Sequence, residues 1–262
     1  MDEFYDATEE ASYLLSSYMA TGRRETLDAS YLCYQRAQEL IDNRQAAPSE
    51  QFLVLTVALA EQFAVIHQRQ RGPEGELVIE LIEPLRTVMP IEMRAHAQVL
   101  LAQVLSDLPI DSRHRNFRSA ILLLEETITL LKQNQATALK ESEVLMELGY
   151  TYSMCRSGYE ADNMELAIAY LEEAAILADA DTNTQMRGMI MMFLGDGFFG
   201  RRRGHSLENY KTSAQYYEAA VGLFLQSGAK DRAARALSRY NYLTPKIAQL
   251  EAGRVNATNG LY

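Results

Sequence analysis

Four histidines are the side chains best suited to metal binding or proton transfer, and they lie far apart in the sequence. His67, His96, His114 and His205 have none of the His-Glu-x-x-His spacing that places two imidazoles on one helix face. Glu92 and His96 are four residues apart and would share such a face. Two ligands do not make a metal site, because zinc normally takes three or four protein groups. The pair is therefore interpreted as solvated or at the edge of the core, and no metal site is predicted.

A Gly-x-Gly-x-x-Gly spacing at Gly195, Gly197 and Gly200 has the letters of a dinucleotide-binding turn. That turn follows a strand and opens a helix, whereas these glycines lie inside a helical pattern. The sequence contains neither a nucleophile elbow nor a Walker loop. It therefore predicts no cofactor and no enzyme activity. Gly195 is expected at a close helix contact, while Gly197 and Gly200 allow a partner to approach, let the helix bend, or mark loose packing near its end.

Charge is unevenly distributed along the chain of 262 residues, whose net charge is −10. Residues 1–200 hold 31 acidic and 15 basic side chains, whereas residues 201–262 hold 4 acidic and 10 basic ones. The acidic majority makes nucleic acid an unlikely partner, because phosphate binding needs a basic surface. The basic segment favours an acidic partner or the acidic end of another copy, although a solvated helix face is the commoner reading. Arg201, Arg202 and Arg203 are expected to offset the dipole at a helix C-terminus.

Nothing in the sequence indicates export or a membrane anchor. The first ten residues are acidic rather than basic, and no apolar run approaches the roughly 20 residues that span a bilayer. Cys33 and Cys155 belong to no Cys-x-x-Cys pair, so we expect small core residues in a reducing compartment. The expected location is cytoplasmic.

A repeated pattern shows what kind of scaffold must position these residues. A leucine, a small residue and, three positions later, a large apolar residue recur with the second member at positions 60, 102, 149 and 195, and looser copies place it at positions 15 and 241. A second pattern follows the small residue by 18 positions in four intervals, as at Ala167, Leu171 and Ala174. Because these offsets share one helix face, each repeat is predicted to be a pair of antiparallel helices. Gly149 and Ala167 are expected to be buried where two helices touch.

Eleven helices are expected, separated by breaks at glycine and proline. They are predicted over residues 4–20, 26–43, 49–70, 76–88, 91–107, 116–133, 137–156, 163–179, 183–202, 208–227 and 230–251. The expected breaks within pairs are Gly22, Gly72 to Gly75, Pro109, Gly158 and Gly204. The expected N-terminal caps are Thr26, Asn116, Asn163, Asn209, Ser49, Pro90 and Thr182, the last in a capping box with Gln185. Residues 1–252 are predicted to form a single helical repeat domain, and residues 253–262 a polar tail.

These motifs resemble the tetratricopeptide repeat (TPR), whose hallmarks are Leu-Gly-x-x-Tyr in the first helix and Ala-x-x-x-Phe in the second. The best copies are Leu148-Gly149…Tyr152 with Ala167…Leu171, and Leu194-Gly195…Phe198 with Ser213…Tyr217. The usual tryptophan is absent, and the period is about a dozen residues longer than normal. Arg156-x-Gly158…Asn163 and Arg202-x-Gly204…Asn209 resemble long-period arrays associated with bacterial caspase-like (CHAT) proteins. The resemblance implies an all-α, right-handed solenoid of about five repeats plus a C-terminal capping helix, with an interaction or sensor role.

The predicted function is a scaffold or adaptor that binds a peptide or protein partner on the face formed by the first helices. Positions on these helices that point away from the neighbouring helix mix apolar, aromatic and polar side chains, as recognition surfaces do. They are Glu143, Met146, Tyr150 and Met154 in the fourth repeat, Met189, Met192, Asp196 and Phe199 in the fifth, and His96, Val99 and Gln103 in the third. The alternative is a helical sensor or enzyme with a small-molecule pocket between repeats. A weaker alternative is an RNA-binding repeat protein that uses the basic C-terminal end.

Overall fold

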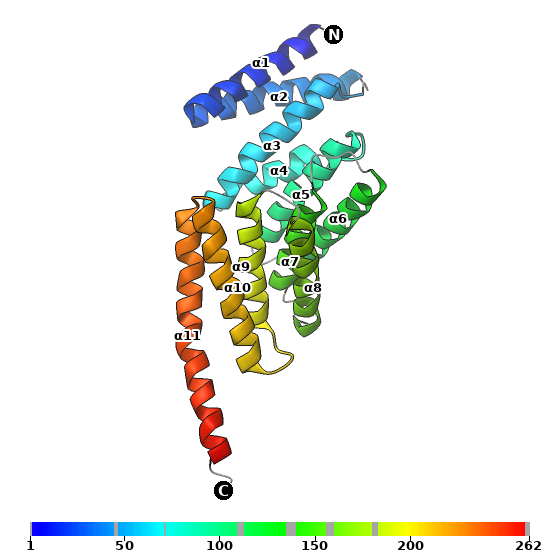
Figure 1. Cartoon of the computed structure of the whole chain (residues 1–262). Coiled ribbons are helices and arrows are strands. Elements are labelled where there is room, and N and C mark those ends of the chain that lie inside the picture. Colours follow the sequence, from blue (N-terminus) through cyan, green and yellow to red (C-terminus); the bar gives the residue numbers. More distant parts are fainter. Residues whose placement is uncertain are drawn as a thin grey trace. The chain divides into compact units, whose positions relative to one another are not determined.

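The computed structural model describes residues 2–44, 47–70, 72–108, 113–134, 140–155, 160–179 and 183–259. Over these residues the chain is all-α, without a strand (Figure 1). The helices are α1 (Asp2–Thr21), α2 (Arg24–Arg44), α3 (Glu50–Gln70), α4 (Glu74–Ile82), α5 (Ile91–Asp107), α6 (Arg113–Gln133), α7 (Glu141–Met154), α8 (Glu160–Asp179), α9 (Thr184–Gly200), α10 (Ser206–Gln226) and α11 (Lys230–Asn259). The prediction of an all-α chain is confirmed.

The chain divides into two compact units, residues 1–111 and 112–262. In the first unit α1 packs on α2, and α3 packs on α4 and α5. In the second unit α7 packs on α8, α9 on α10, and α10 on α11, while α6 lies against α7 (Figure 1). The predicted pairs α1–α2, α3–α4, α7–α8 and α9–α10 are confirmed, as expected of a helical repeat fold. The predicted pair of α5 with α6 is wrong, because α5 packs on α3 and α4 in the first unit and α6 belongs to the second. The single domain over residues 1–252 and the tail after it stay predictions.

Small residues sit where the paired helices touch. A Cβ added to Gly149 would lie 2.6 Å from Cγ of Leu171 and 3.0 Å from the carbonyl oxygen of Ala167. Gly195, one repeat later, has the same relationship to Tyr217, whose Cδ1 would lie 2.6 Å from the added Cβ. Because glycine lacks a Cβ, the second helix of each pair can approach this closely. The predicted packing positions are confirmed.

Gly197 and Gly200 face the preceding repeat. An added Cβ would lie 3.0 Å from Cγ1 of Ile168 at Gly197 and 3.1 Å from Cε of Met164 at Gly200. Both neighbours belong to α8, so these glycines admit another helix of the same chain. Gly197 is buried, so the expectations of an approaching partner and of loose packing are wrong there. Gly200 is exposed and would meet only the end of the Met164 side chain, so its role stays a prediction.

Hydroxyl groups fix the register within two of the pairs. Ser213 on α10 donates a hydrogen bond of 2.6 Å from Oγ to the carbonyl of Gly195. Ser30 on α2 donates an equivalent bond of 2.7 Å to the carbonyl of Ala11. The small residue of the opening repeat is therefore Ala11 and not Leu15, which corrects the first position of the repeat pattern.

Several helix ends differ from the prediction for local reasons. Helix α4 ends at Ile82 and not at residue 88, because Pro84 has no N–H to donate and its ring crowds the preceding turn. Helix α11 runs through Pro245 to Asn259, beyond the expected end at residue 251. Ser49 caps α3 as predicted, since its Oγ accepts from the N–H of Phe52 at 3.2 Å. The predicted breaks at Pro109 and Gly158 lie outside the described residues.

Other predicted caps are replaced by different contacts. Thr26 lies inside α2 and donates its hydroxyl to the carbonyl of Arg23 at 2.6 Å. Asn116 lies inside α6 and so cannot be its cap. Thr182 lies outside the described residues, and α9 is capped by Asn183, whose Oδ1 accepts from the N–H of Met186 at 3.1 Å.

Within the described residues, one helix is long and apolar enough to cross a membrane. This helix, α3, has 56% of its most apolar segment buried inside the protein. Phe52, Leu59 and Phe63 are among its buried side chains, and it packs on α4 and α5. Such burial is typical of a core helix, so α3 is weak evidence for a membrane span. It nevertheless corrects the expectation that no segment approaches the required length.

Candidate functional site

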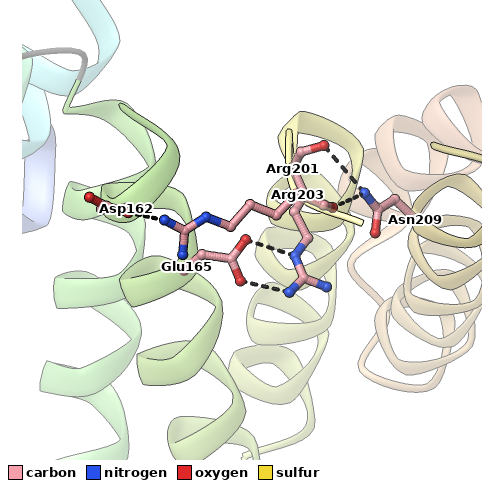
Figure 2. A network of polar contacts seen from close by, with 5 residues as sticks. All are labelled: Asp162, Glu165, Arg201, Arg203 and Asn209. Atoms are coloured by element: carbon pink, nitrogen blue, oxygen red, sulfur yellow. Dashed lines mark hydrogen bonds and ion pairs between the residues drawn. The ribbon is translucent and has the colours of Figure 1, made fainter. Parts of the chain in front are cut away.

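The three consecutive arginines after α9 join it to the preceding helix pair. Arg201 donates from Nε and Nη2 to the two carboxylate oxygens of Glu165, at 2.8 and 2.6 Å. Arg202 pairs with Glu160 at 2.7 Å. Arg203 pairs with Asp162, and Figure 2 shows it beside the Arg201 pair. All three acids lie on α8, so the expectation that the arginines only offset a helix dipole is wrong.

Asparagine side chains hold the loops that precede the second helices. Asn209 donates from Nδ2 to the carbonyls of Arg201 at 3.3 Å and Arg203 at 2.8 Å (Figure 2). Asn163, 46 positions earlier, donates to the carbonyl of Cys155 at 3.0 Å. Each asparagine lies inside its helix rather than at the cap position. The predicted capping roles of Asn163 and Asn209 are therefore wrong, and both residues hold loops in place.

The predicted positions on α9 face α11. Arg232 Nη1 lies 3.0 Å from Sδ of Met189, Arg239 forms an ion pair with Asp196, and Tyr242 packs edge-on against Phe199 with ring centroids 6.0 Å apart. These three contacts connect residues that are 43 positions apart. Two matching rows of side chains therefore line a groove between α9 and α11, and we call it the α9–α11 groove.

Asp196 occupies the centre of this groove. Its carboxylate accepts a hydrogen bond of 2.6 Å from the hydroxyl of Tyr217 and pairs with Arg239. The Arg239 guanidinium also lies 6.0 Å from the ring centroid of Tyr217, within cation–π range. Burial raises the pKa of Tyr217 to about 12, so this phenol is a stable hydrogen-bond donor at neutral pH. The polar centre of the groove is thus preorganised.

A pocket of about 420 Å³ opens beside this centre. It is lined by Asp196, Phe199, Tyr217, Ser238, Arg239, Tyr242 and Leu243. Phe199 and Tyr242 keep 39% and 57% of their surfaces exposed, although Phe199 also contacts Tyr210 at 5.8 Å between ring centroids. The pocket therefore combines exposed aromatic rings with a fixed polar group, as ligand sites generally do.

A row of four basic side chains and one tyrosine borders the groove. Its members on α11 are Arg232, Arg235, Arg239, Tyr242 and Lys246, spaced alternately by three and four residues along one helix face. Within the described residues, Arg239 is the only cation of the row with a carboxylate partner. Lys246 instead lies 4.8 Å from the ring centroid of Tyr242. The row was missed by sequence reasoning, although its spacing is visible in the sequence.

Three other predicted positions are packed inside the protein, and a fourth is paired at its surface. Met146 and Val99 are buried in the core, with 5% and 8% of their surfaces exposed. Tyr150 packs on Phe193 at 4.8 Å between ring centroids. His96 Nε2 lies 2.7 Å from Oε1 of Glu61 on α3, and the His96 side chain keeps 43% of its surface exposed. Burial and ring packing make Met146, Val99 and Tyr150 poor candidates for partner binding, whereas His96 stays a prediction.

The remaining predicted positions differ in exposure. Met154 is 44% exposed at the end of α7, whereas Glu143 and Gln103 are half-buried. Met192 packs against two core clusters, one around Phe224 and one around Tyr217. The structure thus gathers Met189, Met192, Asp196 and Phe199 at one groove, whereas Glu143 and Met154 do not line its pocket and Gln103 belongs to the first unit.

The first unit holds a pocket of its own, with a volume of about 450 Å³, between α2 and α4. Its lining includes the rings of Tyr31 and Tyr34 and the carboxylates of Glu39, Asp42 and Glu80. Burial raises the pKa of Tyr34 to about 12. Among the described residues, no ion pair neutralises these three acids, so the pocket favours a cation. These carboxylates are not placed to hold a metal ion together, and no other group of three or more His, Cys, Asp or Glu side chains is so placed in the described part of the chain.

Comparisons with known proteins give structural likeness at low identity. No family model and no curated protein matches the sequence. The chain is similar to BtubC (BKLC) from P. vanneervenii, with 13% identity and a TM-score of 0.48 over 85% of this chain and 91% of that one. It is also similar to a Podosopora anserina putative kinesin light chain with nearly identical TPR-like repeats, with 14% identity and a TM-score of 0.44 over 91% and 95%. The fold class itself rests on the helix pairs described above.

Proposed function

We propose that this chain is a protein-interaction module that binds a segment of a partner protein in the α9–α11 groove. The observation that carries the proposal is the pocket lined by Phe199, Tyr217 and Tyr242, with Asp196 and Arg239 fixed at its centre. Aromatic rings and arginine are enriched among the few residues that dominate binding energy at protein interfaces, and this pocket presents both.

The charge beside the pocket indicates what the bound segment contains. Arg232, Arg235 and Lys246 lie along one side of the groove, and within the described residues none has a carboxylate partner. A bound segment with acidic side chains would pair with them, while a large apolar side chain would enter the pocket. Such charge complementarity sets specificity and association rate more than affinity. We therefore expect an acidic segment with an aromatic or aliphatic anchor.

Affinity capture tests the proposal with a matched pair of variants. Phe199→Ala with Tyr242→Ala removes the exposed rings of the pocket, whereas Ile176→Ala with Leu177→Ala removes exposed apolar side chains from α8. We expect the groove variant to weaken partner binding by at least about tenfold, which corresponds to roughly 1.4 kcal/mol. The α8 variant should bind like the parent. Equal binding by both variants would refute the groove as the site.

The positions predicted from the sequence suggest a different double variant, Tyr150→Ala with Met192→Ala, but it is a poorer test. Tyr150 packs on Phe193, and Met192 packs against two core clusters. Their removal would create cavities as well as alter a surface, and cavities lower stability. A loss of binding by that double variant would therefore not identify the binding face.

A small-molecule sensor is a second candidate function, and the pocket between α2 and α4 favours it. Tyrosine rings and carboxylates are the groups that bind organic cations, through cation–π contacts and charge. Thermal denaturation with spermidine tests this candidate. We expect a concentration-dependent rise in the melting temperature that Glu80→Gln reduces, because ligand binding stabilises the folded state. An unchanged melting temperature with spermidine would exclude this ligand class.

A further inference from the structure

The outer face of α1 carries a row of acidic side chains. Glu3, Asp6, Glu10 and Tyr13 are spaced by three, four and three residues, and all four are exposed. Tyr13 keeps 75% of its surface exposed, an unusually high value for an aromatic residue. No ion pair involves these three acids among the described residues. Glu10 lies near the Cys33 thiol, whose pKa is raised by burial and, to a smaller extent, by this carboxylate.

This row is complementary to the basic row of α11. Arg232, Arg235, Arg239 and Tyr242 have the same spacing of three, four and three residues. If two helices with these rows lie parallel, each acid of α1 faces a base of α11, in the pairs Glu3–Arg232, Asp6–Arg235 and Glu10–Arg239. Arg239 would then be shared between Glu10 and its own Asp196. Tyr13 then falls beside Tyr242, at the mouth of the groove pocket. The spacing reads the same in both directions, but an antiparallel arrangement gives only two acid–base pairs, Asp6–Arg239 and Glu10–Arg235, instead of three.

We propose that the partner of the α9–α11 groove is a second copy of this chain, and that its α1 lies in the groove parallel to α11. This inference rests on the proposed function, because it uses the same groove. Binding of a helix in a groove through side chains at such spacings is a common mode of recognition. The charge complementarity of two rows within one sequence, the α1 row exposed and the facing α11 positions exposed except at half-buried Arg232, favours a second copy over an unrelated acidic protein.

The interface joins two different surfaces, so a dimer leaves one surface of each kind unoccupied. A copy that offers its α1 still has a free groove, and the copy that accepts it still has a free α1. Such head-to-tail contacts extend into chains or rings. Because the contacts are exposed ion pairs, salt should weaken them, since the Debye length falls from about 30 Å at 0.01 M to about 3 Å at 1 M salt.

Mixing two complementary variants tests the proposal. One variant carries Glu3→Gln and Asp6→Asn, and the other carries Arg232→Gln and Arg235→Gln. Sedimentation velocity at about 100 µM protein and about 20 mM NaCl should show the parent above its monomer mass of 29.6 kDa. Each variant alone should be monomeric. Their equimolar mixture should form a capped one-to-one dimer, because one intact α1 then meets one intact groove.

The mixture is also the control for folding, since only folded variants can restore the dimer. A further control, Arg118→Gln with Lys230→Gln, removes two exposed cations outside the row and should assemble like the parent. A monomeric parent under these conditions would overturn the proposal. A mixture that stays monomeric would overturn it as well. So would variants that each assemble to the same extent as the parent.

A charge exchange tests the parallel register itself. Asp6→Arg should weaken the association at least about tenfold, as should Arg235→Asp, because each places like charges together. The protein carrying both changes should regain most of the parent's association. If the double variant is as weak as the single ones, the two residues do not face each other and the register is wrong.

The outcomes separate this inference from the proposed function. If the parent is monomeric but the variant Phe199→Ala with Tyr242→Ala loses a different bound protein, the groove remains the site and the second copy is excluded. If that groove variant binds its partner and self-associates as strongly as the parent, the groove is not the binding site. The inference then fails together with the proposed function.

Discussion

A methyl group on Gly149 would lie 2.6 Å from Cγ of Leu171, closer than real Cβ atoms approach a neighbour. We predict that Gly149→Ala lowers the free energy of unfolding by about 1–3 kcal/mol, because the helices α7 and α8 must move apart. Alanine stabilises a helix relative to glycine by up to about 1 kcal/mol, and this gain partly offsets the cost of the close contact. Urea denaturation gives the difference directly.

Gly222 offers a matched control for this substitution. It lies within α10, and an added Cβ would meet nothing within 4 Å. Gly222→Ala should therefore stabilise the protein by up to about 1 kcal/mol through helix propensity alone. Equal effects of the two substitutions would show that Gly149 is not at a close helix contact.

A second prediction concerns the pH dependence of the Arg201–Glu165 pair. The hydrogen bonds from Arg201 lower the pKa of Glu165 below its usual value. A carboxyl group with a lowered folded-state pKa stabilises the protein above its unfolded pKa of about 4.3, and this contribution disappears as the pH falls through the folded value. Glu165→Gln should therefore cost about 1 kcal/mol at pH 7, allowing for partial exposure of the pair, and much less near pH 3.

Denaturation of parent and variant across this pH range measures the difference. Glu218→Gln, an exposed carboxylate on α10, serves as the control and should show little pH-dependent change. A stability difference for Glu165→Gln that persists unchanged to pH 3 would mean that the charge of Glu165 does not contribute.

A third prediction concerns Asn209, which donates to the carbonyls of Arg201 and Arg203. Asn209 is buried, with 6% of its surface exposed, so its replacement leaves those carbonyls without this donor. We expect Asn209→Ala to lower the free energy of unfolding by about 1–3 kcal/mol. Exposed Asn241→Ala should change it by less than about 0.5 kcal/mol.

Hydrogen exchange would locate the effect of the asparagine. The amides of residues 201–205 should exchange faster in Asn209→Ala, because the loop there loses two of its contacts. Unchanged exchange in this segment would indicate that the loop is held by the arginine pairs alone.

The helix pairs could be predicted because their signals are local. Gly149 and Leu171 follow the repeat pattern, and one helix period is enough to place both at a contact. The arginine pairs could not be predicted in the same way, because Glu165 and Arg201 are 36 residues apart in different repeats. No local sequence pattern predicts which acidic side chains of α8 lie beside the C-terminal end of α9.

The groove was predicted only in part for a related reason. Positions on a first helix were assigned to the binding face because they point away from their own second helix. In a stack of repeats such positions also meet the neighbouring repeat, which is why Met146 lies in the core with Ile190 of α9. At Asp196 and Phe199 the neighbour is α11, whose row is basic and aromatic and leaves a pocket.

Photo-crosslinking from the groove tests the central claim most directly. A benzophenone amino acid in place of Tyr242 places a reactive group at the pocket, and one in place of Ile176 places it on the exposed face of α8. We predict that the probe at position 242 crosslinks to α1 of a second copy, identified by mass spectrometry, and that the probe at position 176 does not. Crosslinks from position 176 with none from position 242 would contradict the α9–α11 groove as the binding site.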